Sequence, residues 1–345
     1  MAPDTLVVRA LDAPSPICHH EAVDSVVFSL SPFSSRFFHL APPPLKPSLL
    51  RDLRYRLEYA GLRILIGFVR LFPVDLGGSI SAKAWRFLGK RNRRHKRALM
   101  NLERAFPEKT PEERERIALA AWDNLGRVMV ETMNIDRILK DPGRLHVTNG
   151  HWIGRYNQKM GPALIVTMHM GNWELGMWPV MLAGVSPAGV YRQVKNPYVD
   201  RYLRAQRKDL YPGGLFGRGR TAGVDETQKT ARLIMDYVRQ GGRLGFISDL
   251  FDGGGVAVPF FGYPAKSMPI AAMIARRVGA RIWIGRCVRI GKRAVFDVNV
   301  NELRIPRTQN QAEDIRAITA AIQRQFEVWI RENPEQFMWS NRRWF

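Results

Sequence analysis

The sequence predicts an α/β protein in which a helical N-terminal part precedes a mostly parallel sheet flanked by helices. Short β-rich runs alternate with helical stretches after Pro162, at the spacing of strand–helix–strand units. From Leu53 to about Leu139, in contrast, apolar residues recur with the period of a helix. The chain has 345 residues, 46% of them hydrophobic, and is therefore long enough to bury a large core.

The N-terminal region divides into two parts. Residues 1–47 are rich in proline and serine, show no sustained period and are expected to form a poorly ordered extension. They do not have the pattern of a secretory signal. Residues 48–150 are expected to be helical and to associate with a membrane. Pro107 and Pro111 mark a break in this part, and Thr110 with Glu113 predicts a capping box that starts the next helix.

The segment Leu57–Phe72 is the most apolar stretch of the helical part. It is interrupted by Glu58, Arg63 and Arg70 and falls short of the roughly 20 uninterrupted apolar residues of a spanning helix. Arginines at positions 56, 63 and 70 recur every seven residues and form one stripe on a helix. Two interpretations stay open: a helix in a membrane interface with its arginines on headgroup phosphates, and a core helix.

Residues 151–345 are expected to form the α/β core. We expect five strands, the last two as an antiparallel hairpin, at Ala163–Thr167, Ala188–Arg192, Arg243–Ser248, Arg281–Ile290 and Ala294–Val300. We expect helices in the connections and near the C-terminus, at Trp173–Leu182, Asp200–Leu210, Val224–Arg239 and Ala312–Glu332.

The charge balance is strongly basic: 53 Lys and Arg against 31 Asp and Glu give a net charge of +22. Such a charge predicts attraction to nucleic acid, anionic lipid or an acidic protein. Six cations lie between Lys90 and Arg97 without the zinc spacing, aromatic platform or helix-turn-helix pattern of a nucleic-acid module, so a bilayer or an acidic carrier protein explains them at least as well. The two cysteines, Cys18 and Cys287, exclude a disulfide framework or a four-cysteine metal site and indicate a reducing compartment.

The first strand of the core ends at a candidate catalytic pair. His169 and Glu174 are five residues apart and would not share the face of one helix, so they meet only if His169 lies on the loop before it. Asn172 is placed to cap that helix, and Glu174 could then accept the second imidazole N–H and leave the other nitrogen as a general base. Chance spacing remains an alternative, because His19 and Asp24 match equally, and so does a structural histidine.

The other strand ends supply cations and a carboxylate. Arg192 ends the second strand and suits a phosphate or a developing oxyanion, with Lys195 and Asn196 just beyond, whereas Arg201–Lys208 reads as a solvated basic face. Asp249 follows the third strand. The stretch 214–221 is expected to be a glycine-rich loop bordering a site and not a P-loop, because arginine stands at position 220 in place of the lysine and no β-run precedes it. The apolar run 256–262 is more often core than the wall of an acyl groove.

The segment His169–Glu174 resembles the HX4(D/E) motif of the glycerolipid and lysophospholipid acyltransferase superfamily. The surrounding sequence, from about residue 50 to the end, resembles the late lauroyl or myristoyl (HtrB-like) acyltransferases of lipid A biosynthesis. The matching blocks stand in family order: Ala105–Glu108, His169–Glu174, Tyr191–Arg192 with Lys195–Pro197, Asp249 with Val258–Gly262, and Pro334–Gln336 with Trp339 and Arg342–Trp344. Two positions depart from the family pattern: Leu250 stands where glutamine is usual, and Asn341 where histidine is usual.

The resemblance implies a glycerolipid acyltransferase-like fold and acyl transfer from a thioester on acyl carrier protein to a hydroxyl of a lipid A precursor, without metal or other cofactor. It implies that His169 deprotonates the acceptor hydroxyl and that Glu174 orients His169. Arg192 would hold a phosphate or the oxyanion, Asp249 would line the site, and Asn172, Lys195 and Asn196 would contact substrate.

The implied setting is the cytoplasmic face of the bacterial inner membrane, with acyl carrier protein, the glycolipid and the anionic membrane surface as partners and no nucleic acid. Two other functions stay open at this point. One is transfer to a glycerophospholipid or another glycolipid, and the other is a non-catalytic basic protein that binds membrane or nucleic acid.

Overall fold

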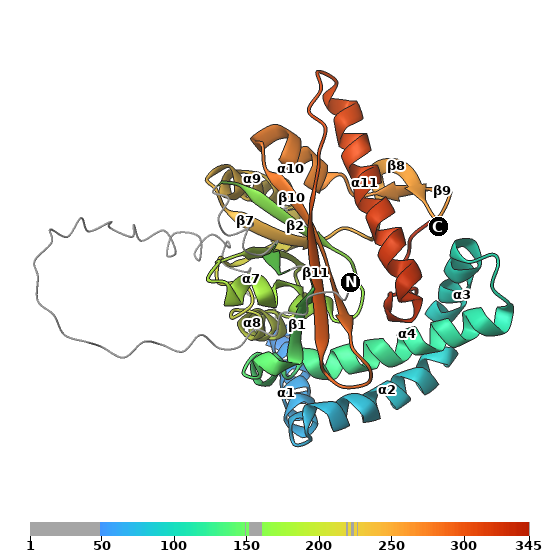
Figure 1. Ribbon diagram of the computed structural model, residues 1–345. Helices are drawn as coiled ribbons and strands as arrows, with labels where there is room; N and C mark the ends of the chain where they lie inside the picture. The colour runs from blue at the N-terminus through green and yellow to red at the C-terminus, as the bar shows by residue number, and fades with distance from the viewer. Residues whose placement is uncertain are drawn as a thin grey trace, which may run out of the picture.

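The computed structural model describes residues 49–148, 150–151, 161–218, 220–221, 224–225 and 227–344 (Figure 1). The extension expected at 1–47 lies outside the described residues. A seven-stranded sheet has the order β1-β11-β10-β2-β7-β3-β4. Its strands are β1 (Leu145–Thr148), β2 (Ala163–Thr167), β3 (Ala188–Arg192), β4 (Leu215–Arg218), β7 (Arg243–Ile247), β10 (Arg281–Arg289) and β11 (Phe296–Leu303). Neighbouring strands are parallel except for β10 and β11, which confirms the predicted α/β class.

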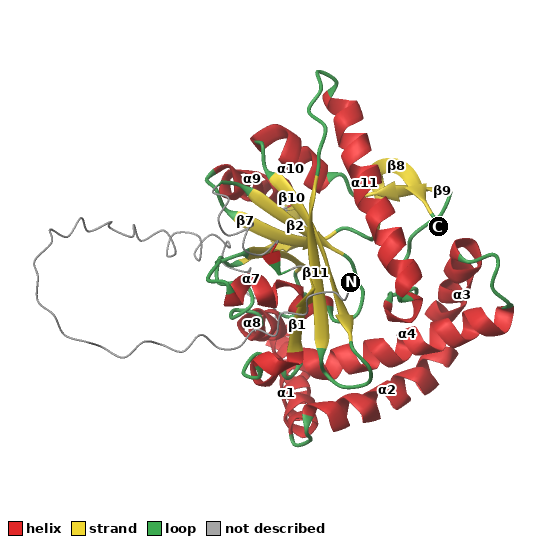
Figure 2. Cartoon of the chain, viewed as in Figure 1, coloured by secondary structure: helices red, strands yellow, loops and turns green. Residues whose placement is uncertain are grey.

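Helices precede the sheet and then flank it (Figure 2). The N-terminal set is α1 (Leu49–Arg70), α2 (Val74–Arg91), α3 (Arg93–Ala105), α4 (Pro111–Thr132) and α5 (Ile135–Ile138). The later helices are α7 (Trp178–Leu182), α8 (Pro197–Gln206), α9 (Thr227–Arg239), α10 (Ile270–Val278) and α11 (Gln311–Glu332). Within the described residues, the remaining elements are two small two-stranded sheets and three 3-10 turns: β5 (Arg220–Thr221) with β6 (Val224–Asp225), β8 (Phe251–Phe260) with β9 (Tyr263–Ser267), and Pro142–Arg144, Trp173–Met177 and Pro334–Gln336.

The central strand β2 has a covered surface on both sides. Leu164 and Val166 belong to one buried cluster, shared with α10 and α11, whereas Ala163 and Ile165 belong to another that contains Trp178. Alternate residues of a strand point to opposite faces of the sheet, so both faces of β2 are buried. This explains why the strand has an uninterrupted apolar sequence.

Several expected elements are confirmed, and others differ. The strands at 163–167 and 188–192 match to the residue, and the capping box is present, with Thr110 Oγ1 accepting from Glu113 N at 3.2 Å and Glu113 Oε2 from Thr110 N at 2.8 Å. The expected loop at 214–221 is wrong in part, because Leu215–Arg218 forms the edge strand β4 beside β3. The sheet also gains β1 from within the helical part, and the helix expected at 173–182 begins as a 3-10 turn. In the apolar run 256–262, Phe260 and Phe261 are buried, as expected for core.

The first two helices lie along the same lower side of the molecule in Figure 1. In the part of the chain that the structure describes, no single helix is long and apolar enough to cross a membrane, and only α1 and α2 together reach that length and composition, across a bend of 118°. The arginine stripe of α1 contacts protein groups. Arg56 Nε lies 2.7 Å from Asp52, the Arg63 guanidinium lies 5.0 Å from the centre of the Tyr202 ring, and Arg70 pairs with Asp136.

Candidate active site

His169 lies on a tight loop between β2 and the 3-10 turn Trp173–Met177, as the sequence predicts. Gly171 in this loop has φ +55°, a left-handed conformation that favours glycine. A Cβ on Gly171 would stand only 1.9 Å from the carbonyl oxygen of Cys287 in β10. The Gly171 carbonyl also accepts a hydrogen bond from Asn124 Nδ2 of α4 at 3.0 Å. The loop is therefore pressed against β10 and α4, and only glycine fits at this position.

The C-terminal segment holds the same loop from its other side. Met338 N donates to the His169 carbonyl at 3.0 Å, and Gly171 N donates to the Gln336 carbonyl at 3.0 Å. Between these two bonds, Met170 forms an antiparallel bridge with Phe337. The backbone of His169 is thus fixed by a segment almost 170 residues further along the chain.

The imidazole of His169 has a carboxylate partner, and that partner is Asp249. His169 Nδ1 lies 2.8 Å from Asp249 Oδ1, and the His169 backbone N–H donates to Asp249 Oδ2 at 3.2 Å. The Asp249 side chain is 1% exposed, whereas 18% of the His169 side chain is open to solvent. The Trp173 ring packs edge-on against the imidazole, with 5.2 Å between ring centres. With Nδ1 committed to Asp249, Nε2 is the nitrogen available to a substrate.

Asp249 also sets the protonation chemistry of the histidine. Burial of the ring opposes its charged form, but the negative charge and hydrogen bond of Asp249 outweigh this and raise the pKa of His169 above its ordinary value. The charge of Glu174 adds a smaller contribution in the same direction. A base with this environment accepts a proton readily and is stabilised once it is positive.

Glu174 does not make the hydrogen bond that the sequence predicted for it. Its carboxylate instead forms a two-point ion pair with Arg207, at 2.6 Å to Nε and 2.7 Å to Nη2. The two side chains are 15% and 17% exposed, so Arg207 is not part of the solvated basic face expected for 201–208. Burial alone would raise the pKa of Glu174, but the charge of Arg207 and its hydrogen bonds lower it, so the carboxylate stays ionised. Glu174 therefore acts on His169 through the electrostatic effect of its charge and not through a hydrogen bond.

A buried polar network supports the loop from below. Glu131 of α4 and Arg289 of β10 form an ion pair in which the side chains are 3% and 4% exposed. Asn172 Nδ2 donates to Glu131 Oε2 at 2.8 Å, and Asn172 Oδ1 accepts from the backbone N–H of Glu174 at 3.2 Å. The Gln336 amide bonds both the N–H and the C=O of Arg289, at 2.8 and 3.0 Å. Asn172 caps the turn as expected, and its amide donates to one protein group and accepts from another.

Sequence reasoning missed Glu131 and Arg289, although one signal was available. Glu131 directly follows the apolar run Val128-Met129-Val130, and a charged residue in such a stretch needs a partner if it is buried.

The structure separates the three residues expected at the second strand end. Arg192 and Lys195 are exposed, and neither side chain makes a hydrogen bond or ion pair with the residues that the structure describes. Asn196 is buried instead: its Oδ1 caps α8 by accepting from Tyr198 N at 3.0 Å. Its Nδ2 donates to the Tyr55 carbonyl of α1 at 2.9 Å. Asn196 thus joins α8 to α1, whereas the two cations remain available to an anion.

Arg343 is a second buried cation near the histidine pair. It is 3% exposed, and its Nη2 donates to Ser267 Oγ and Gln323 Oε1, both at 2.9 Å. Burial lowers the pKa of Arg343 to about 10, and the charge of Asp249 acts in the opposite direction. This position was visible in the sequence only as part of the C-terminal block Arg342–Trp344.

These contacts describe an Asp–His pair, with the carboxylate buried and the imidazole partly open to solvent, at the carboxyl ends of two adjacent parallel strands, β2 and β7. Within the described residues, no group of three His, Cys, Asp or Glu side chains is arranged to hold a metal ion. The arrangement can remove a proton from a hydroxyl at Nε2 and stabilise the resulting imidazolium with Asp249.

Comparison with known proteins gives a consistent match along the chain. The family model of the bacterial lipid A biosynthesis acyltransferases matches residues 45–345. The chain is 27% identical over 319 residues to the lipid A biosynthesis lauroyltransferase of Escherichia coli (strain K12), covering 87% of this chain and 95% of the relative. It is 25% identical over 304 residues to the lipid A biosynthesis palmitoleoyltransferase of the same organism, covering 84% and 91%. It is 23% identical over 294 residues to the lipid A biosynthesis acyltransferase 2 of Shigella flexneri, covering 80% and 85%.

Proposed function

The chain belongs to the bacterial lipid A biosynthesis acyltransferase family and is an acyltransferase, and we propose that it transfers a fatty acyl chain from an acyl carrier protein thioester to a hydroxyl of a lipid A precursor. The observation that carries this proposal is the hydrogen bond of 2.8 Å between His169 Nδ1 and the buried carboxylate of Asp249, at the position where the family motif begins. A positioned base next to an open surface is what activation of a hydroxyl requires.

The reaction we propose uses His169 twice. Nε2 takes the proton of the acceptor hydroxyl while its oxygen attacks the thioester carbonyl, which gives a tetrahedral oxyanion. Collapse of this intermediate breaks the carbon–sulfur bond, and the imidazolium returns the proton to the leaving thiolate. Asp249 keeps Nδ1 protonated and stabilises the imidazolium between the two steps. One ester forms and one thioester breaks, so the histidine ends the cycle neutral.

The other candidate residues take supporting roles in this proposal. Glu174, held by Arg207, adds negative charge that favours the imidazolium without touching it. Arg192 and Lys195, exposed at the end of β3 and unpaired in the described part of the chain, are suited to a phosphate of the acceptor or to the oxyanion. Asn172 holds the loop in place through its contacts with protein groups.

We further propose that α1 and α2 lie on an anionic membrane, the cytoplasmic face of the inner membrane. The side of α1 toward α8 is polar: Tyr198 Oη donates to Asp52 at 2.8 Å, and Asn196 Nδ2 donates to Glu58 at 3.0 Å. Its opposite side is apolar and exposed at Leu49, Leu50, Leu53, Leu57, Ile64, Leu65 and Phe68, and α2 exposes Leu76, Ile80, Phe87 and Leu88. A soluble protein turns such faces inward, so the inverted arrangement supports burial in lipid.

The test is direct transfer. Purified full-length protein is incubated with radiolabelled acyl carrier protein thioesters of several chain lengths and a lipid A precursor in mixed micelles, in parallel with the His169→Ala variant. We expect label in the glycolipid with the wild type only. Near-normal transfer by the variant would contradict the mechanism. Label that enters added glycerophospholipid but not the lipid A precursor would contradict the acceptor.

A further inference from the structure

The helix α3 carries a strongly basic surface that the proposed chemistry does not use. Its members are Arg93, Arg94, Lys96 and Arg97, here called the basic face of α3. All four side chains are exposed, and none makes an ion pair or side-chain hydrogen bond with the residues that the structure describes. The neighbouring Lys90 of α2 differs, because its Nζ lies 3.3 Å from Glu115. The basic face of α3 is therefore unpaired within the described part of the chain.

Two of these cations oppose the stability of their own helix. Asn92 caps α3 by accepting from Arg94 N at 2.9 Å, so Arg93 and Arg94 occupy the first helical turn. The N-terminus of a helix carries partial positive charge and favours acidic residues, but the first turn of α3 contains none. Residues that destabilise the helix in which they lie are expected where function requires them.

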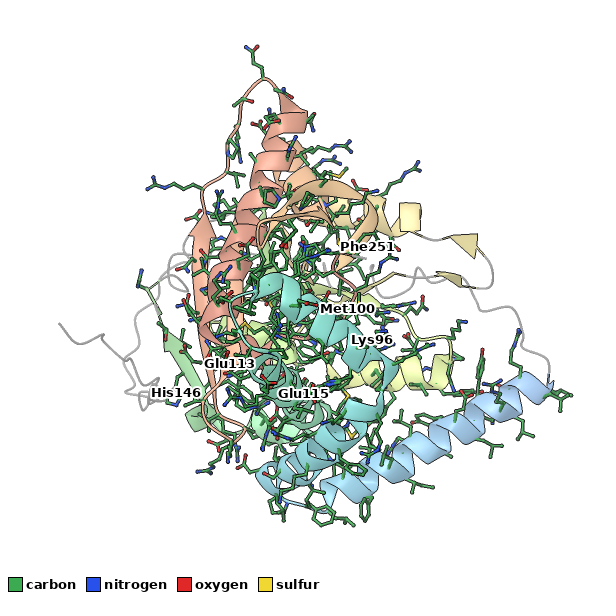
Figure 3. All side chains as sticks on the ribbon, turned by 90° about the vertical axis from the view of Figure 1, so that its right-hand side faces the viewer. Lys96, Met100, Glu113, Glu115, His146 and Phe251 are labelled. Atoms are coloured by element: carbon green, nitrogen blue, oxygen red, sulfur yellow. The ribbon has the colours of Figure 1, made fainter. Side chains whose placement is uncertain are left out.

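The basic face of α3 also differs from the proposed membrane surface. The exposed sides of α1 and α2 are rich in large apolar residues. In α3, Met100 is the one large apolar residue that is exposed, at 40%. Figure 3 looks onto this helix, with Lys96 and Met100 on it. Charge without side chains that insert into lipid favours flat contact with an acidic macromolecule over burial in a bilayer.

The inner side of α3 leads to the catalytic histidine. Asn101 Nδ2 donates to the carbonyls of Trp339 and Asn341, at 2.8 and 2.9 Å. Next to them, Met338 N donates to the carbonyl of His169 at 3.0 Å. One layer of C-terminal chain thus separates α3 from the loop that holds His169. A partner seated on the outer side of α3 would be separated from the His169 loop by this one layer of chain.

We propose that the basic face of α3 is the docking surface for the acyl donor's carrier, a strongly acidic small protein that holds the acyl chain as a thioester. This inference rests on the proposed function, since it assigns the place where that donor binds. Complementary charge raises the rate of encounter and fixes the orientation of the bound partner, and it weakens with salt. The acyl chemistry itself needs no contact with α3.

The test compares two thioesters in the full-length protein. The variant Arg93→Glu/Arg94→Glu reverses two charges of the basic face, and the control Arg316→Glu/Arg324→Glu reverses two exposed arginines of α11 that have no ion pair in the described part of the chain. Each protein receives acyl carrier protein thioester or the carrier-free acyl-pantetheine thioester, and carrier binding is measured separately by fluorescence anisotropy.

For the α3 variant we expect KM and Kd for the carrier to rise on the order of tenfold, with kcat and the acyl-pantetheine rate unchanged. The control should match the wild type. The α3 variant should also melt at or above the wild-type temperature, because acidic residues suit the first turn of a helix, so a loss cannot be ascribed to misfolding.

Three results would overturn the docking inference: unchanged carrier binding, an equal loss with acyl-pantetheine, or weakened binding to anionic vesicles with an unchanged Kd for the carrier. The last would assign the basic face of α3 to the membrane. Failure of the wild type to transfer from either thioester would instead contradict the proposed function, while the anisotropy measurement would still decide the docking.

Discussion

Replacing Asp249 with asparagine removes the charge of the histidine's partner with almost no change in shape. Both carboxylate oxygens accept hydrogen bonds from His169, one from the backbone N–H at 3.2 Å and one from Nδ1 at 2.8 Å. An amide has only one acceptor oxygen. If that oxygen keeps the backbone N–H, the amide N–H faces Nδ1, and the ring carries its own proton on Nε2. The base is then blocked, and the charge that stabilised the imidazolium is gone.

The expected loss of rate follows from the loss of both the free base and the charge that stabilises the imidazolium. General-base catalysis and its supporting carboxylate together are expected to contribute about 10³-fold to the rate, or about 4 kcal/mol of barrier. The remaining activity should have its acidic limb at lower pH than the wild type, because Asp249 holds the pKa of His169 above 6.5 and burial alone lowers it. Wild-type activity should accordingly rise with pH through a pKa above 6.5.

Stability gives an independent check of the same pair. A histidine whose pKa is raised on folding contributes stability that is fully present below the unfolded pKa of about 6.5 and is lost as pH rises through the folded pKa. The wild type should therefore exceed Asp249→Asn in melting temperature by more at pH 5.5 than at pH 8.5. Thermal denaturation followed by circular dichroism at the two pH values measures this difference.

The assay is the initial rate of acyl transfer between pH 5.5 and 9, with saturating donor and acceptor, for the wild type, Asp249→Asn and Glu174→Gln. Because Glu174 acts through its field, its neutral variant should keep the Asp249 hydrogen bond and lose less activity than Asp249→Asn. A near-normal rate for Asp249→Asn, together with a loss of about 10³-fold for Glu174→Gln, would refute the reasoning and make Glu174 the true partner of His169.

Three further changes test the support of the site and the membrane face. Glu131→Ala leaves the Arg289 guanidinium buried without its partner and should cost about 3–5 kcal/mol of unfolding free energy in urea titrations, whereas a loss below about 1 kcal/mol would show that the pair is dispensable. Gly171→Ala should abolish transfer and lower the melting temperature, because a Cβ there meets a backbone carbonyl at 1.9 Å, and an active, stable variant would contradict the loop geometry. Leu57→Glu/Phe68→Glu should weaken binding to anionic vesicles by at least about tenfold in sedimentation assays, with the melting temperature unchanged. Unaltered binding would contradict the placement of α1 on the membrane.

The partner of His169 shows where sequence reasoning reaches its limit. Both carboxylates were placed correctly, Glu174 in the turn after the first core strand and Asp249 at the end of the third. The choice between them depends on strand order, because β2 and β7 are neighbours in the sheet although 80 residues separate His169 from Asp249. The short spacing along the chain favoured Glu174 as the partner of His169. The adjacency of β2 and β7 in the sheet instead brings Asp249 into hydrogen-bond distance.

Secondary structure was predictable where burial left a clear pattern. The strands 163–167 and 188–192 were predicted to the residue. The first is buried on both faces and is therefore a short apolar run between breaks, whereas in the second only the first two residues are buried. The edge strand β4 was missed, since it follows Gly214 and contains Gly217, and glycine lowers the strand signal. Its pairing with β3, which lies outside any local pattern, makes it a strand.

The sequence could not decide between a core helix and an interfacial helix at 57–72, because both have one apolar and one polar side. The fold decides which side is turned outward: Asn196 and Tyr198 of α8 hold the polar side of α1, and the apolar side is left exposed. At the other end of α8, Arg207 holds Glu174 beside the histidine. One short helix is thus attached to α1 at its start and, just beyond its end, to Glu174. If α1 lies in the lipid interface, this attachment fixes the height of His169 above the headgroups, which is what an enzyme needs when its acceptor hydroxyl is anchored in the membrane and its acyl donor arrives from solution.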